Sequence, residues 1–406
     1  MERKFDFYGS MPRDVLNSYL SRAVTHSGLC YETGTFEDDL RMLLHEGAKF
    51  IGRAAYFWSR SCEIGKYFRI CRERAELAHK ADPQLILQAC VFECINKQQV
   101  TSIPIPAYVF EAFGLTPEER NFNYDAMLYP DGRYVDFWGK DSSVEDILQT
   151  ETKMWIYYLA TAYIDAGYEG IHFGQVCLIG QDDRGDFKNW REVIAKIRAY
   201  ANEHGRRRYV LFDAHQLGNL RQDTEMFDYN AFPIRLQDVP EIQWECCCEE
   251  NYLDSLFNEK DGHSRPFIVE FDNWGKMSED QLGKPQVNNY HAWGYDEITW
   301  FTKLSPERRD KFLNYIWDWV NERYPEGWVQ MPSRRCLVDK VKSVWESANV
   351  EKLNEINKFE HVSYTIDEKG NAHITRWNYS ANMPSDNCPF GMGDEDTIAE
   401  IFHREI

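Results

Sequence analysis

The chain has 406 residues, and its 46 Lys and Arg against 66 Asp and Glu give a formal net charge of −20 at pH 7. This acidic balance argues against a nucleic-acid partner and against an anionic membrane surface, because both repel a protein of this sign. Hydrophobic residues at 43% and charged residues at 28% are ordinary globular values, which excludes wholesale disorder and a fibrous protein. A chain of this length forms one large α/β domain with additions, or roughly two or three smaller domains.

Aromatic residues are unusually frequent, with 13 Trp, 23 Tyr and 24 Phe making 15% of the chain. Trp and Tyr combine an apolar face with a polar tip, which suits stacking on sugar rings as well as packing in a core. Composition alone leaves both interpretations open.

Targeting and redox signals are few. The first residues carry charges without an apolar run of signal-peptide length, and no run of 18 apolar residues predicts a membrane span. The eleven cysteines form no zinc-type C-x-x-C pairs, although Cys246 to Cys248 are consecutive. We therefore expect reduced thiols in a cytoplasmic protein of bacterial type, with no membrane association and no metal.

Short apolar runs alternate with amphipathic stretches, which predicts an α/β fold with parallel strands. Helices are predicted at 36–45, 66–80, 142–167 and 186–204, and from Ser305 onward. Segment 95–140 contains four prolines and little periodicity, which indicates a long insertion. The apolar runs predict eight strands, at 49–58, 85–93, 168–179, 208–215, 229–236, 266–272, 289–296 and 327–331.

Eight such units in roughly 290 residues predict a (β/α)8 TIM barrel. An open doubly wound sheet is the alternative, but no G-x-G-x-x-G or P-loop sequence follows any predicted strand. Residues 361–377 alternate and turn at Lys369-Gly370, which predicts a β-hairpin. We therefore expect a barrel with an N-terminal helical segment over 1–335 and a small C-terminal β-rich appendage over 336–406.

Polar side chains at the predicted strand ends are the candidates for a site, because a TIM barrel carries its active site at the C-terminal ends of its strands. Several predicted strands end in a carboxylate, which is costly to bury unless it is paired or solvated. Each residue also has a structural interpretation, such as an ion pair for Arg53 or a cap for Asp296. The candidates are Arg53, Trp58, Glu93, His172, Gln175, Asp213, His215, Glu270, Asp272, Trp274, His291, Trp293, Asp296 and Glu297.

Cleavage of a glycosidic bond requires one carboxyl group to protonate the leaving oxygen and a second to attack or to activate water. With strand-end carboxylates and with Trp58, Trp274 and Trp293 near the rim, residues 45–335 resemble TIM-barrel glycoside hydrolases. The fourth predicted strand departs from the common retaining pattern of such barrels, since it ends in Asp213-Ala214-His215 and not in an Asn-Glu pair.

The resemblance implies a hydrolase of carbohydrate metabolism that acts on a glycoside or oligosaccharide without a cofactor. We predict Asp213 and Glu270 as the catalytic carboxyls and Glu297 as a reserve nucleophile, with the other candidates binding the substrate. Whether the chain forms a homo-oligomer is left open.

Two other functions fit the same residues. The D-x-H motif at 213–215, together with His172, Glu270 and Asp272, is also typical of divalent-metal barrel enzymes such as sugar isomerases, epimerases and lyases. A carbohydrate-binding barrel without catalysis would keep the aromatic residues, but it would not need the carboxylates.

Overall fold

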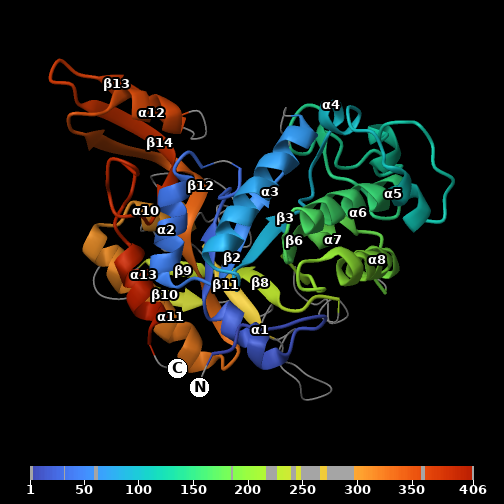
Figure 1. Ribbon diagram of the computed structural model, residues 1–406, viewed down its shortest axis with the longest axis horizontal. Coiled ribbons are helices and arrows are strands. Elements are labelled where there is room, and N and C mark those ends of the chain that lie inside the picture. The colour runs from blue at the N-terminus through green and yellow to red at the C-terminus, as the bar shows by residue number, and fades with distance from the viewer. Residues whose placement is uncertain are drawn as a thin grey trace.

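The computed structural model describes residues 3–31, 33–58, 63–183, 186–215, 226–238, 244–247, 266–271, 297–357 and 362–404. Within these residues, eight strands pair in parallel around a closed ring, in the order β1-β2-β3-β6-β7-β8-β11-β12, and β12 pairs back with β1 (Figure 1). The predicted TIM barrel is therefore confirmed. The ring strands are β1 (Ala23–His26), β2 (Phe50–Tyr56), β3 (Ile86–Cys90), β6 (Gly170–Gln175), β7 (Leu211–His215), β8 (Asn230–Pro233), β11 (Phe267–Glu270) and β12 (Gly327–Trp345).

The first ring strand was not predicted. Ala23–His26 has only four residues, all of them buried, which is too short for a recognisable apolar run. The predicted strand at 289–296 lies outside the described residues, and β11 pairs directly with β12, so no strand intervenes between them in the ring. Glu270 consequently ends the seventh ring strand and Asp213 lies on the fifth.

Helices cover the outside of the barrel. The helix predicted at 186–204 is confirmed as α8 (Lys188–His204), in which Trp190, Ile194, Ile197 and Ala201 are buried. The helices in chain order are α1 (Arg13–Leu20), α2 (Phe36–Glu46), α3 (Ile64–Ala81), α6 (Thr150–Asp165), α7 (Val176–Ile179), α8 (Lys188–His204), α10 (Glu297–Thr302), α11 (Pro306–Arg323) and α13 (Glu395–Phe402). The short strands β9 (Arg235–Asp238) and β10 (Trp244–Cys247) pair outside the ring.

The predicted insertion occupies the connection between β3 and β6. It contains β4 (Ile95–Asn96), α4 (Lys97–Val100), α5 (Ala107–Ala112), the 3-10 helix η1 (Tyr124–Met127) and β5 (Ser142–Ser143). The helix predicted from residue 142 begins only at Thr150, because Ser142 and Ser143 pair with β4 as a short strand. Figure 1 shows α4 and α5 on the side of the barrel opposite α13.

A small sheet extends from the end of the barrel. Strand β12 continues past the ring and pairs with β14 (Ala372–Ser380), which forms the predicted hairpin with β13 (Val362–Ile366). Helix α12 (Val350–Asn357) covers this sheet through Leu353 and Ile356. Strand β12 runs across residue 335, and α13 packs against α2. The division of the chain into two domains at 335/336 stays a prediction.

A buried carboxylate ties together the N-terminal ends of three ring strands. Glu169 precedes β6 and is fully buried, and it accepts bonds of 2.7 Å from both Nε and Nη2 of Arg207, which precedes β7. Arg206 pairs with the same carboxylate, and Arg207 also donates to Tyr19, whose hydroxyl bonds the carbonyl of Gln84 before β3. In a TIM barrel this end serves stability rather than catalysis.

We expect Glu169→Ala to lower the free energy of unfolding by about 3 kcal/mol, because it leaves two arginines without their buried counter-ion. Glu192→Ala is the matched control, since Glu192 is exposed and pairs with Lys153 at the surface, where such pairs contribute about 1 kcal/mol or less. Urea unfolding of both variants measures the difference. Equal losses in the two variants would contradict the structural role of Glu169.

Candidate active site

Side chains from two ring strands meet at a carboxylate on a third. Glu270 ends β11, and its Oε1 accepts a bond of 2.6 Å from Arg53 Nη2, while its Oε2 accepts one of 3.2 Å from Arg53 Nε. His215, at the end of β7, bonds Oε1 of the same carboxylate through Nε2. Because these partners come from β2, β7 and β11, the closed ring itself holds the cluster together.

The backbone of Arg53 has a left-handed conformation, with φ 57°. Such a conformation is uncommon for a residue with a Cβ and persists where the surrounding structure enforces it. Here the pairing between β2 and β3 shifts register after Ile51, and the Arg53 N–H donates to Gln88 Oε1. The irregularity turns the guanidinium toward Glu270.

Glu270 is held in its ionised form. Burial alone would raise its pKa, but the charge of Arg53 and the bond from His215 outweigh burial and hold the pKa well below the usual range. A carboxylate that stays charged in a buried position can attack an electrophilic carbon or stabilise a positive charge, but it does not act as a proton donor at neutral pH.

A second cluster lies beside the first. Asp213 accepts a bond of 2.7 Å from Gln88 Nε2, and its Oδ2 lies 2.8 Å from His172 Nδ1. Asp213 and His215 are two residues apart on β7, and both bond side chains from other ring strands, so they share one face of β7. The rings of His172 and His215 are 4.7 Å apart, so the two clusters are in contact.

His172 combines burial with an available nitrogen. Its Nε2 has no hydrogen-bond partner among the residues that the structure describes. Burial lowers the pKa of His172, although the neighbouring Asp213 opposes the shift. A neutral ring that donates from Nδ1 to Asp213 has a lone pair on Nε2, and this nitrogen can accept a proton or bind a metal.

Glu93 extends the cluster toward the insertion. Its Oε2 accepts from the Gln175 backbone N–H at 2.9 Å and its Oε1 from Gln175 Nε2 at 2.8 Å. A Cβ at position 174 would lie 2.2 Å from Glu93 Oε2, so only a glycine there lets Glu93 reach over the end of β6. Gly174 also has φ +52°, which favours glycine.

Glu145, from the insertion, is fully buried, and neither of its carboxylate oxygens has a partner among the described residues. Burial, reinforced by the charge of Glu93, raises the pKa of Glu145 well above the usual range, which favours the protonated form of this group.

The structure brings together most of the predicted site residues that it describes. Trp58 is half-buried and packs edge-to-face on Phe92 at 5.4 Å. Glu297 does not end a strand, because it is the first residue of α10, where it is buried. Five predicted residues lie outside the described part of the chain: Asp272, Trp274, His291, Trp293 and Asp296.

Four residues of the candidate site were not predicted from the sequence: Gln88, Tyr229, Glu145 and Trp138. Gln88 carries a signal that could have revealed it, because it is a single polar residue inside the apolar run of β3 and its side chain links Arg53, Asp213 and the Tyr229 hydroxyl. Trp138 belongs to the insertion, whose sequence has no periodicity that would place its side chains. Glu145 lies in the first turn of the helix predicted from residue 142, but that helix begins only at Thr150.

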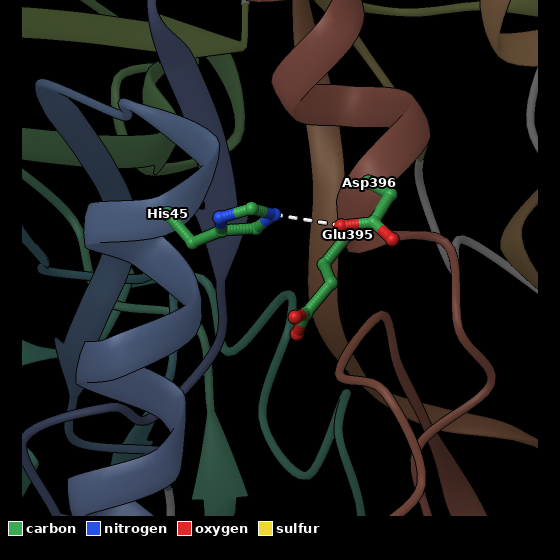
Figure 2. Close-up of side chains that lie close together, drawn as sticks. All are labelled: His45, Glu395 and Asp396. Carbon is green, nitrogen blue, oxygen red and sulfur yellow. Dashed lines mark hydrogen bonds and ion pairs between the residues drawn. The ribbon is translucent and has the colours of Figure 1, made fainter.

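Within the described residues, ligand atoms of His45, Glu395 and Asp396 come within 4.8 Å of one another, as a metal site would require (Figure 2). Glu395 already accepts two bonds of 2.8 Å from Arg41, and Asp396 lies 2.6 Å from His45 Nε2. Both His45 and Asp396 are exposed at the surface. Since Arg41 neutralises Glu395, these contacts are best explained as ion pairs that join α2 to α13.

No family model matches the chain, and no curated protein matches it. Solved structures similar to it include the glycoside hydrolase domain of PelA from Pseudomonas aeruginosa, at 10% identity and a TM-score of 0.33 over 72% of this chain and 90% of that one. A variant of the trehalulose synthase MutB is 9% identical, with a TM-score of 0.42 over 77% of this chain and 65% of the other. Rubisco from Pyrococcus horikoshii is 7% identical, with a TM-score of 0.32 over 65% and 52%.

Glycoside hydrolases and Rubisco are thus both among the similar structures. One barrel fold supports many chemistries, so function has to be argued from the site. None of the helices in the described ranges is both long and apolar enough to cross a bilayer.

Proposed function

We propose that the protein is a glycoside hydrolase whose reaction centre is the pair of clusters around Glu270 and Asp213. The observation that carries the proposal is the buried, ionised Glu270, fixed by Arg53 and His215 at the C-terminal end of the barrel beside a histidine with an available nitrogen. Hydrolysis of a glycoside needs a charged carboxylate at the sugar carbon together with groups that move protons.

In this proposal Glu270 acts on the anomeric carbon. As the glycosidic bond breaks, positive charge develops on the sugar ring, and a carboxylate at that carbon stabilises the charge or forms a covalent bond. Both oxygens of Glu270 are oriented by Arg53, so little reorganisation is needed when the charge develops.

Asp213 then contributes through His172 and not directly on the substrate. With Nδ1 donating to Asp213, Nε2 can take a proton from the attacking water, and Asp213 stabilises the positive charge that appears on the ring. This changes the sequence-based hypothesis, in which Asp213 itself was one of the catalytic carboxyls.

Proton donation to the leaving oxygen falls to the pair of Glu93 and Glu145. Burial raises the pKa of Glu145 and so favours its protonated form, and Glu93 lies over the end of β6 beside Gln175. The other side chains of the two clusters hold these groups in place.

The cysteines bear on the cellular compartment. The seven cysteines whose side chains are described are buried thiols, which supports the proposal of a reducing, cytoplasmic compartment.

The test is activity profiling against aryl glycosides and oligosaccharides, with and without exhaustive chelation. We expect hydrolysis of at least one substrate class, unchanged by the chelator. Complete inactivity of the folded protein across the panel would contradict the proposal.

One observation favours a second candidate, a divalent-metal enzyme acting on a sugar. A histidine that ligates a metal usually donates its other ring nitrogen to a carboxylate, as His172 does to Asp213. Titration with Zn²⁺, Mn²⁺ and Co²⁺, followed by elemental analysis of the dialysed protein, distinguishes the two candidates. One equivalent of tightly bound metal, lost in His172→Ala, together with activity that disappears on chelation, would favour the metal enzyme.

A further inference from the structure

A continuous row of aromatic rings leads from the candidate active site to the insertion. Phe92 and Trp58 have their ring centroids 5.4 Å apart, Trp58 and Trp138 5.1 Å, and Trp138 and Phe137 4.8 Å. The row joins residues that follow β3 and β2 to a turn of the insertion more than forty residues further along the chain. The barrel and the insertion therefore build it together.

The inner end of the row touches the reaction centre. The Phe92 ring packs against the His172 ring at 5.9 Å and lies 5.7 Å from the guanidinium carbon of Arg53. Trp138 is anchored next to it, since its indole Nε1 donates to the carbonyl of Glu93 at 2.7 Å. Its ring is therefore fixed in position before any ligand binds.

The outer end of the row is exposed. Phe137 is 49% exposed and its neighbour Val135 is 44% exposed, while Trp58 and Trp138 are half-buried. Phe137 thus exposes an aromatic ring next to the half-buried Trp138 that it contacts. The backbone is also strained here, because Tyr134 and Asp136 have φ of 61° and 55°.

We propose that Trp58, Trp138 and Phe137 form a binding platform for the outer units of an oligosaccharide or polysaccharide whose bond is cleaved beside Glu270. The assignment to a saccharide rests on the proposed function. Aromatic faces stack on the apolar faces of sugar rings, and a platform continuous with the site would bind the units next to the scissile bond. The preferred substrate is then a chain of several sugars rather than a monosaccharide glycoside.

The experiment compares Trp138→Ala and Phe137→Ala with Tyr8→Ala. Tyr8 is a matched control, because it is an exposed aromatic residue beside Gly9, which bonds Arg207 at the opposite, N-terminal end of the barrel. Retardation of each protein is measured in native gels containing soluble starch, xylan, mixed-linkage β-glucan or chitosan. Circular dichroism and thermal melting verify that each variant is folded.

We expect at least one polysaccharide to retard the native protein and Tyr8→Ala equally, and to retard both platform variants about tenfold more weakly. With aryl oligosaccharides of that polymer, the variants should lose about tenfold more kcat/KM on the longest substrate than on the monosaccharide glycoside. Phe137→Ala leaves the bond between the Trp138 indole and the Glu93 carbonyl in place, so it tests binding even where Trp138→Ala disturbs Glu93.

The outcomes separate the platform from the hydrolase proposal. Retardation that depends on the platform, in a protein that cleaves nothing, supports the platform and contradicts the hydrolase. Hydrolysis with equal retardation of all variants, or with no retardation of the native protein in any gel, overturns the platform alone. Variants that change only self-association in sedimentation would show an interface between copies and would also overturn it.

Discussion

Replacing Glu270 by glutamine should lower the turnover rate per folded molecule by about 10²–10⁴-fold or more. The amide keeps the shape of the side chain but removes the charge that Arg53 and His215 hold in place. A neutral group neither attacks the anomeric carbon nor stabilises positive charge on it. Steady-state rates on the best aryl glycoside, normalised to the folded fraction, measure the effect.

The matched control is Glu46→Gln. Glu46 is also fully buried, but burial raises its pKa well above the usual range and its partner is the Ser333 hydroxyl, so the fold favours its neutral form. An amide there changes little in charge, and activity should stay near that of the native protein. Equal activity in Glu270→Gln and Glu46→Gln would contradict a catalytic role for Glu270.

The same substitution has a consequence for stability. Glu270→Gln leaves Arg53 buried without its counter-ion, so the variant should lose about 3 kcal/mol in the free energy of unfolding at neutral pH. Because the pKa of Glu270 is depressed by folding, its stabilisation is fully present above the ordinary value of 4.5 and is lost as the pH falls through the folded-state value. The native protein should therefore lose more stability than the variant on acidification below that range.

The barrel could be predicted from the sequence because seven of its strands are apolar runs with recognisable ends. The missed strand, Ala23–His26, is buried over only four residues and follows a short helix, so no period is visible in it. The omission shifted the numbering of the six ring strands from β2 to β11, whereas β12 is the eighth strand in both counts because a strand was predicted at 289–296. Asp213 and Glu270 nevertheless remain two strands apart in the ring, because both lie after the missing strand.

The pairing of the site residues could not be predicted in the same way. The period of two along a strand places Asp213 and His215 on one face, but their partners depend on the closure of the ring. Arg53 reaches Glu270 only through a local irregularity in β2, and Gln88 connects the two clusters from inside an apolar strand. Glu297 was predicted from its position after an expected strand and instead begins α10.

Replacing Asp213 by asparagine should lower the turnover rate by about 10²–10⁴-fold, because an amide no longer fixes the ring and proton of His172 as a carboxylate does. Asp228→Asn is the matched control. Asp228 is also bound by an arginine, a tyrosine and a backbone N–H, but it precedes β8 at the opposite end of the barrel. That variant should keep its activity per folded molecule.

The pH profile of Asp213→Asn separates a role through His172 from a purely structural one. The charge of Asp213 raises the pKa of His172 against the larger effect of burial, so removing this charge lowers that pKa further. If His172 must be neutral to accept a proton, activity is lost on acidification when the ring becomes protonated, and the acid limb of kcat/KM should move to lower pH in the variant.

Combining Asp213→Asn with His172→Gln should cost little more than either change alone, since both remove the same proton acceptor. A rate loss with an unmoved acid limb, or losses that multiply in the double variant, would mean that Asp213 acts on the substrate itself, as the sequence first suggested, and that the proton acceptor lies elsewhere.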